Sequence, residues 1–275
     1  MLLIESLFLQ ILVIAIGACI GSFLNVVIYR VPAGLSILHP PSRCPHCLRQ
    51  LAPRDNIPII GWFLIKGKCR YCHTPVSWRY PAIEAFTAFL FWCIALYFGN
   101  SQPPLILGFY ALFLSWLLAL SMIDFDTMTL PNSLTQSGLL LGSFYQGSLA
   151  FANSSDRTNF ATHLLLGIGG AVLGIWLLDI MRIAGRIFLQ KEAMGGGDAK
   201  LAAMIGMWLG WQQVLLTILL ASAIGTCVGV IAVLFSKVCK QQPIPFGPFL
   251  AIGGTISLFF GKSILKTYLG WFGLA

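Results

Sequence analysis

Two aspartates and four cysteines occur in patterns that could carry out chemistry. Asp198 follows three glycines in "GGGDAK" (195–200), and Asp124 lies within "SMIDFDTMTLPN" (121–132). Both stand at the ends of long apolar stretches, where an ionisable side chain is costly to bury and is usually functional. Two carboxylates that lie close together share one proton, so one can take a proton from water while the other polarises a peptide carbonyl. Asp124 and Asp198 are therefore predicted to form a catalytic dyad of the aspartic-protease kind if the chain brings them together.

The glycines before Asp198 fit the same chemistry. Glycine lets another backbone approach closely, so an extended peptide could reach the carboxylate without meeting a side chain. A helix that begins at or just after Asp198 would also offer free N–H groups near the developing negative charge. The alternative is that each aspartate only caps a helix or pairs with a nearby cation, such as Lys200 or Arg182.

The remaining seven acidic residues fall into two groups. Four lie in connections or at a chain end and are expected on the solvated surface: Glu5, Asp55, Asp156 and Glu192. Three lie in or beside apolar stretches: Glu84, Asp126 and Asp179. Asp126 follows Asp124 by two residues, so the two carboxylates point in different directions on a helix.

The four cysteines are Cys44 and Cys47 in "CPHC" and Cys69 and Cys72 in "CRYC". Two Cys-x-x-Cys motifs about twenty residues apart supply four thiolates for a tetrahedral structural Zn²⁺. A pair of disulfides or a redox relay is the alternative, although a reducing cytosol disfavours stable disulfides. His46 or His73 could replace one of the cysteines as a ligand. The other cysteines, Cys19, Cys93, Cys227 and Cys239, are expected to be ordinary apolar residues.

The composition shows which elements must position these residues. Only 9% of the 275 residues are charged, 57% are hydrophobic, and the mean hydropathy is +0.84. A soluble domain carries about a quarter charged residues. The apolar runs are continuous rather than alternating, which favours helices over a membrane β-barrel. The first run lacks the basic start and the cleavage site of a signal peptide, so we interpret it as a transmembrane span of the mature protein.

The sequence predicts an all-α polytopic membrane protein with about eight transmembrane helices. The expected spans are about 6–29, 81–98, 104–123, 134–150, 161–181, 199–211, 213–235 and 246–261. Because the sixth of these is short, the protein could instead have seven transmembrane helices. With the N-terminus outside, fourteen of the seventeen Lys and Arg residues fall on the cytoplasmic side, and only Arg157, Lys262 and Lys266 fall outside. The net charge of +8 is thus explained by topology and by attraction to anionic lipid, not by nucleic-acid binding.

We predict three parts: a first transmembrane helix (1–29), a cytoplasmic, Cys-rich and zinc-ribbon-like module that carries the four cysteines (30–80), and a membrane-embedded core (81–275). Both acids of the predicted dyad would lie at the cytoplasmic face of that core. Pairs of glycines four residues apart are expected to pack helices closely: Gly17/Gly21, Gly170/Gly174, Gly206/Gly210 and Gly225/Gly229. Met204, Met207 and Trp208 could line a substrate groove, but core or lipid contact is the simpler expectation.

Taken in order, several stretches resemble those of the type IV prepilin peptidases, also called leader peptidase–N-methyltransferases. They are "GSFLNVVIYR" (21–30), "CPHC", "DNIP" (55–58), "CRYC", "RYPAIE" (79–84), "IDFDTMTLPN" (123–132), "GGGDAK" (195–200) and "PIPFGPFLA" (243–251). The resemblance covers nearly the whole chain. It implies cleavage of the basic leader from type IV prepilins or type II secretion pseudopilins, after a Gly at the cytoplasmic face of the bacterial inner membrane. It also places the family's catalytic aspartates on Asp124 and Asp198.

The resemblance further implies a methyltransferase activity. Many members of the family methylate the new N-terminal residue with S-adenosylmethionine, and Gly67 in "KGKC" matches a position associated with methylation. No Gly-rich nucleotide-binding motif in the sequence supports this independently. Asn132 departs from the family, which often has Asp after the Leu-Pro pair, so any electrostatic role of that position is open.

Two other functional classes fit parts of the sequence. A proton-coupled transporter would use membrane acids as a relay, but would place them near mid-membrane rather than at one face. A membrane thiol oxidoreductase would use the Cys-x-x-Cys motifs, but would place them near the oxidising side of the membrane.

Overall fold

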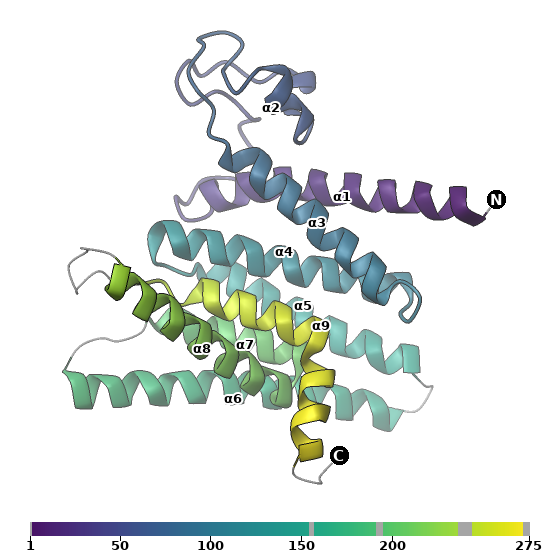
Figure 1. Cartoon of the computed structure of the whole chain (residues 1–275), viewed down its shortest axis with the longest axis vertical. Helices are drawn as coiled ribbons and strands as arrows, with labels where there is room; N and C mark the ends of the chain where they lie inside the picture. Colours follow the sequence, from purple (N-terminus) through teal and green to yellow (C-terminus); the bar gives the residue numbers. More distant parts are fainter. Residues whose placement is uncertain (1, 154–156, 191–194, 236–243, 272–275) are drawn as a thin grey trace. The chain divides into compact units, whose positions relative to one another are not determined.

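The computed structural model describes residues 2–153, 157–190, 195–235 and 244–271, which are helical apart from their connections (Figure 1). Within these residues there is no β-strand, only isolated bridges. The elements are α1 (Leu2–Arg30), the 3₁₀ helix η1 (Pro53–Asn56), α2 (Ile60–Leu64), α3 (Arg79–Phe98), α4 (Pro104–Thr127), α5 (Asn132–Asn153), α6 (Arg157–Leu189), α7 (Gly196–Leu209), α8 (Trp211–Phe235) and α9 (Gly247–Trp271). Each predicted span corresponds to one of these helices, so the all-α membrane fold is confirmed.

Six of these helices are long and apolar enough to cross a membrane on their own: α1, α3, α4, α6, α8 and α9. The other two differ for physical reasons. α5 is interrupted by Ser, Gln and Asn, which lower its hydropathy. α7 has 14 residues and is about 21 Å long, shorter than the bilayer core of about 30 Å. Both pack against other helices of the same unit and need no full lipid-facing surface.

Some helix ends differ from the predicted spans. α7 begins at Gly196 rather than at or after Asp198, and it ends before Gly210, whose φ of +83° breaks the helix ahead of α8. α9 continues to Trp271, past the predicted end at 261. Lys262 and Lys266 end the apolar run, but lysine is a good helix former and does not end the helix.

The chain divides into two compact units, Met1–Ser115 and Trp116–Ala275. In the first unit, α1 packs along α3. A Cβ atom at Gly17 would lie 2.7 Å from the Ala88 Cα, and one at Gly21 would lie 2.7 Å from the Glu84 Cα. This glycine pair therefore allows close helix contact, as predicted. The Cys-rich segment leaves the end of α1 and returns at the start of α3.

In the second unit, α7 forms the centre and contacts α5, α6, α8 and α9. Ten of its fourteen residues are buried, including Met204, Met207 and Trp208. These three side chains are therefore core residues rather than the lining of a groove. Gly170 and Gly206 bring α6 and α7 into backbone contact, because a Cβ on either would clash with the other's carbonyl oxygen.

Several residues weighed in the sequence lie outside the described residues: Asp156, Lys191, Glu192, Lys237, Cys239, Lys240 and Pro243.

Candidate functional site

Asp124 and Asp198 lie in the same unit, near the C-terminal end of α4 and in the first turn of α7. Both are buried, with relative exposures of 5% and 6%. Their carboxylates are close enough to interact electrostatically. The helix ends around them thus bring together two acids that are 74 residues apart in sequence (198 − 124).

Asp124 is held by the beginning of α9. The Gly247 N–H donates to Asp124 Oδ2 over 2.9 Å. A Cβ at position 247 would lie 2.6 Å from that oxygen and 3.0 Å from Cγ, so only glycine leaves room for the carboxylate. The unpaired N–H groups at a helix N-terminus also favour a nearby negative charge.

The three glycines before Asp198 have different surroundings. A Cβ at Gly196 would lie 2.7 Å from Arg182 Nη1, and one at Gly197 would lie 2.9 Å from the Leu130 Cβ. These two glycines therefore let the start of α7 pack against neighbouring segments of its own unit. Gly195 is exposed and has open space, since the nearest atom to its Cβ would be Asp198 Oδ2 at 3.8 Å. Only Gly195 remains available for close approach of a substrate backbone.

The two cations that could have paired with these aspartates have other partners. Lys200 Nζ donates to Asn132 Oδ1 over 2.6 Å, and Arg182 Nη2 lies 3.2 Å from Asp179 Oδ1. Within the described part of the chain, neither Asp124 nor Asp198 forms an ion pair. A purely structural ion-pair role is thus not observed for either.

The other acids have distinct places. Asp126 is exposed, whereas Asp124 is buried, as their spacing on a helix predicts. Glu84 is buried in the first unit, where it accepts the Ile59 N–H over 2.6 Å. The expectation of a solvated surface position for Asp55 is wrong. Asp55 is only 8% exposed, and its Oδ2 accepts a hydrogen bond from Arg70 Nε over 2.9 Å. This hydrogen bond holds the pKa of the Asp55 carboxyl below its usual range.

The sulfur atoms of Cys44, Cys47, Cys69 and Cys72 all lie within 4.8 Å of one another. Cys44 Sγ lies 3.7 Å from Cys72 Sγ, and Cys47 Sγ lies 4.0 Å from Cys69 Sγ. These distances are too long for disulfides, and all four thiols are free. His46 and His73 are not members of this cluster.

The two motifs share one backbone conformation that the residue types do not reveal. In each, the residue after the second cysteine has a positive φ, and its N–H donates over 2.9 Å to the first cysteine's carbonyl. These residues are Leu48 and His73. A bridge closes each turn, Arg43 with Gln50 and Lys68 with Pro75. Two equivalent knuckles thus present their thiols to one point.

Gly67 shapes the same module. Its φ is +65°, and a Cβ there would lie 2.8 Å from Cζ2 of Trp62. The Trp62 Nε1–H donates to the Val76 carbonyl over 3.0 Å, and the Val76 N–H donates to Gly67 O over 2.8 Å. A left-handed turn against an indole ring explains why glycine stands here.

Two contacts of the site were missed by reasoning from sequence. One is the support of Asp124 by Gly247, for which the only signal is the Gly-Pro pair that can start a helix. The other is the pairing of Lys200 with Asn132, which joins the two acid-bearing segments.

Comparison with known proteins gives two family matches along the chain. Residues 15–98 match the bacterial peptidase A24 N-terminal domain, and residues 111–230 match the type IV leader peptidase family. No solved structure matches the chain significantly.

Similar curated proteins share nearly the full length of the chain. The prepilin leader peptidase/N-methyltransferase of Stutzerimonas stutzeri is 37% identical over 280 residues, covering 93% of this chain and 92% of that protein. The proteins of the same name from Aeromonas hydrophila and Pseudomonas aeruginosa are each 36% identical, covering 94% of this chain and 93% of their own. With this similarity along nearly the whole length, the chain belongs to the type IV leader peptidase family.

Proposed function

We propose that the chain is an aspartic endopeptidase that removes the basic leader from type IV prepilins or type II secretion pseudopilins, with Asp124 and Asp198 as its dyad. The observation that carries the proposal is the pair of buried, interacting carboxylates without a cationic partner in the described residues. The names of the similar proteins agree with this reaction. They give no support to a proton-coupled transporter or a thiol oxidoreductase.

In the proposed reaction, the two carboxylates share one proton, as close carboxylates do. The ionised carboxylate takes a proton from water, whose oxygen attacks the carbonyl carbon of the glycine at the scissile bond. The protonated carboxyl donates a hydrogen bond to the carbonyl oxygen, which becomes the hydroxyl of a tetrahedral intermediate. Proton transfer to the leaving nitrogen then breaks the C–N bond and releases leader and mature pilin.

The surroundings of the dyad suit a peptide substrate. Gly195 has open space beside Asp198, so an extended backbone can approach the carboxylate there. The distribution of Lys and Arg supports a multi-pass protein in the inner membrane, with its N-terminus outside and the dyad at the cytoplasmic face. The leader of the substrate would lie on that same side.

The test of the dyad is a cleavage assay in membranes with a prepilin carrying a Gly–Phe junction. Asp124→Asn and Asp198→Asn should each lower the cleavage rate at least about 1,000-fold at matched expression, because removing one member of a catalytic pair disables both. Asp126→Asn and Asp179→Asn are matched controls and should cleave normally. Normal cleavage by either dyad variant would remove that aspartate from the mechanism.

We further propose that the cysteine cluster binds structural Zn²⁺. A tetrahedral site with Zn–S bonds of about 2.3 Å requires sulfurs about 3.8 Å apart, which agrees with the 3.7 and 4.0 Å separations. The Thr74 hydroxyl lies 3.2 Å from Cys72 Sγ, within reach to donate to a thiolate ligand there. Residues 30–80 would then form a metal-stabilised module between a first span (1–29) and the peptidase core (81–275).

For the N-methyltransferase activity, we propose a site for S-adenosylmethionine in the first unit. A cavity of about 610 Å³ lies between the second half of α1 and residues 37–58. Its walls carry the polar side chains of Ser22, Ser42, Gln50 and Asn56 and the cation of Arg30, which can hold hydroxyl, amino and carboxylate groups. When bound, the cofactor would supply the methyl group. Gly67 would act only by shaping the module, since its Cα faces the Trp62 ring.

The proposed binding of S-adenosylmethionine in this cavity can be tested by a substitution that fills the cavity with a larger side chain. Val26 lines it from α1, so Val26→Trp should weaken S-adenosylmethionine binding at least about tenfold in equilibrium dialysis, with leader cleavage unchanged. Ile16→Trp, on an exposed part of α1 outside the cavity, is the matched control. Unaltered binding by Val26→Trp would place the methyl donor elsewhere.

A further inference from the structure

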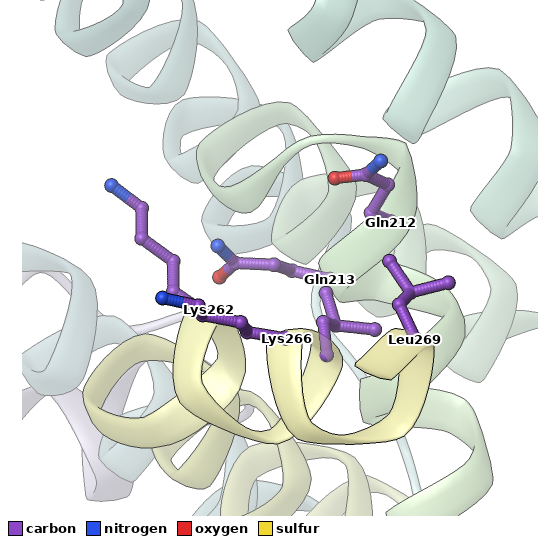
Figure 2. Close-up of a pocket in the computed structure, with 6 residues that line it drawn as sticks. Gln212, Gln213, Lys262, Lys266 and Leu269 are labelled. Carbon is purple, nitrogen blue, oxygen red and sulfur yellow. The ribbon is translucent and has the colours of Figure 1, made fainter. Parts of the chain in front are cut away.

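A second cavity, of about 330 Å³, lies between the beginning of α8 and the second half of α9. Figure 2 shows side chains from both helices around it. It is lined by two amides, two ammonium groups and two aliphatic side chains: Gln212, Gln213, Lys262, Lys266, Leu265 and Leu269. None of these residues belongs to the dyad or to its supports.

The register of α8 and α9 places this cavity at the opposite end of the second unit from the dyad. The two helices are antiparallel, because Gln213 packs on Gly261 while Thr217 bonds to Ser257 and Gly225 faces Phe249. Gly247 contacts Asp124 at the start of α9, and Lys262 follows fifteen residues later, about 22 Å along the helix. If the dyad is at the cytoplasmic face, the cavity is at the outer one.

The charges at this end are not balanced. In the part of the chain that the structure describes, neither Lys262 nor Lys266 has an ion-pair partner. They are four residues apart on one face of α9, where like charges repel each other. In the topology predicted from the positive-inside rule, they are also two of the three basic residues on the outer side of the membrane. An anion between them would relieve the repulsion.

The surroundings match a membrane interface. Trp211 begins α8, and Tyr268 and Trp271 lie near the end of α9; all three are exposed. Exposed Trp and Tyr side chains gather where lipid headgroups meet the hydrocarbon core. Leu265 and Leu269 follow one another by one helical turn and extend the wall of the cavity with apolar surface.

We propose that this cavity binds the phosphate of an anionic phospholipid in the outer leaflet. The Lys262 and Lys266 ammonium groups and the amides of Gln212 and Gln213 would donate to the phosphate oxygens, and Leu265 and Leu269 would contact the adjoining acyl chain. The recognised chemistry is a phosphate anion joined to an apolar chain. This site is independent of the peptidase reaction and would tie the ends of α8 and α9 to lipid.

The test uses the full chain, purified in a neutral detergent, and native mass spectrometry with added phosphatidylglycerol or phosphatidylethanolamine. The wild type should retain phosphatidylglycerol in preference to phosphatidylethanolamine. The double variant Lys262→Gln with Lys266→Gln should bind phosphatidylglycerol about 30-fold more weakly, about fivefold for each lysine. A double variant to Arg should retain binding, and Lys66→Gln with Lys68→Gln removes the same charge from the first unit as a matched control.

A competition experiment separates the two sources of phosphate. If inorganic phosphate at millimolar concentration fails to displace phosphatidylglycerol, the site takes a lipid. If inorganic phosphate displaces the lipid and binds the Gln double variant only weakly, the lysine side chains form a site for free phosphate. That result would overturn the lipid proposal. Equal retention of phosphatidylglycerol by the wild type and the Gln double variant would also overturn the proposal, as would equal retention of the two lipids by the wild type.

Discussion

At the residue scale, the position of the Asp124 carboxylate depends on a glycine, Gly247, which has no side chain. Gly247 supplies the N–H that Asp124 accepts, and its lack of a Cβ leaves the space that the carboxylate fills. Gly197 plays a similar part beside Leu130 at the start of α7. Both acids thus depend on close backbone packing rather than on charged neighbours.

Gly247→Ala should lower the leader cleavage rate at least about 100-fold while the protein still inserts and folds. The new Cβ would lie 2.6 Å from Asp124 Oδ2, so the carboxylate must move, and small displacements of catalytic groups have effects of this size. The measurement is cleavage of a Gly–Phe prepilin at matched expression. Gly229→Ala is the control, since nothing lies within 4 Å of its added Cβ. Equal rates for Gly247→Ala and wild type would show that this contact does not position Asp124.

Asn132 stands where the family often has aspartate, and its side chain still accepts from Lys200. Asn132→Asp should therefore keep the contact and turn it into an exposed ion pair, which adds at most about 1 kcal/mol. Cleavage should stay within about twofold of wild type, and the thermal midpoint in detergent should be equal or slightly higher. Lys200→Met, which removes the donor, should lower the midpoint both in the wild type and in the Asn132→Asp variant. A loss of cleavage beyond tenfold in Asn132→Asp would mean that charge at this position opposes the reaction.

At the scale of the elements, α6 and α7 meet through glycines, and this contact fixes the helix that carries Asp198. Gly170→Ala should destabilise the second unit by about 1–3 kcal/mol, because the added methyl clashes with the carbonyls of α7. Gly169→Ala is a neighbouring control, since nothing lies within 4 Å of its Cβ. Thermal unfolding in detergent measures both variants. Equal midpoints would contradict the close packing of these helices.

The elements themselves were largely predictable, and the contacts between them were not. Long apolar runs reveal spans, and the Cys-x-x-Cys spacing reveals a four-thiol cluster, because each signal is local in sequence. Asp55 contacts Arg70, and Asp124 contacts Gly247. Neither pair stands in a local sequence motif that would reveal the contact. Such contacts depend on how separate segments pack against one another in space, which a single sequence does not state.

At the scale of the whole molecule, the two sets of chemical groups lie in different units. Asp124, Asp198 and Gly247 belong to residues 116–275, whereas the cysteine cluster, Gly67 and the 610 Å³ cavity belong to residues 1–115. Each unit has its own packed helices. Loss of the metal module should therefore affect methyl transfer more strongly than leader cleavage.

Removal of the metal tests this division. Cys69 is buried in the cluster, so Cys69→Ser should abolish binding of one Zn²⁺ per chain and expose residues 30–80 to proteolysis, because metal binding supplies the folding energy of so small a module. Methyl transfer should then be lost, with leader cleavage reduced less than about threefold. Cys227→Ser, an exposed cysteine outside the cluster, should leave metal content and both activities unchanged. Cleavage that falls in parallel with metal content would show instead that the dyad depends on the module, and that the two units work only as one enzyme.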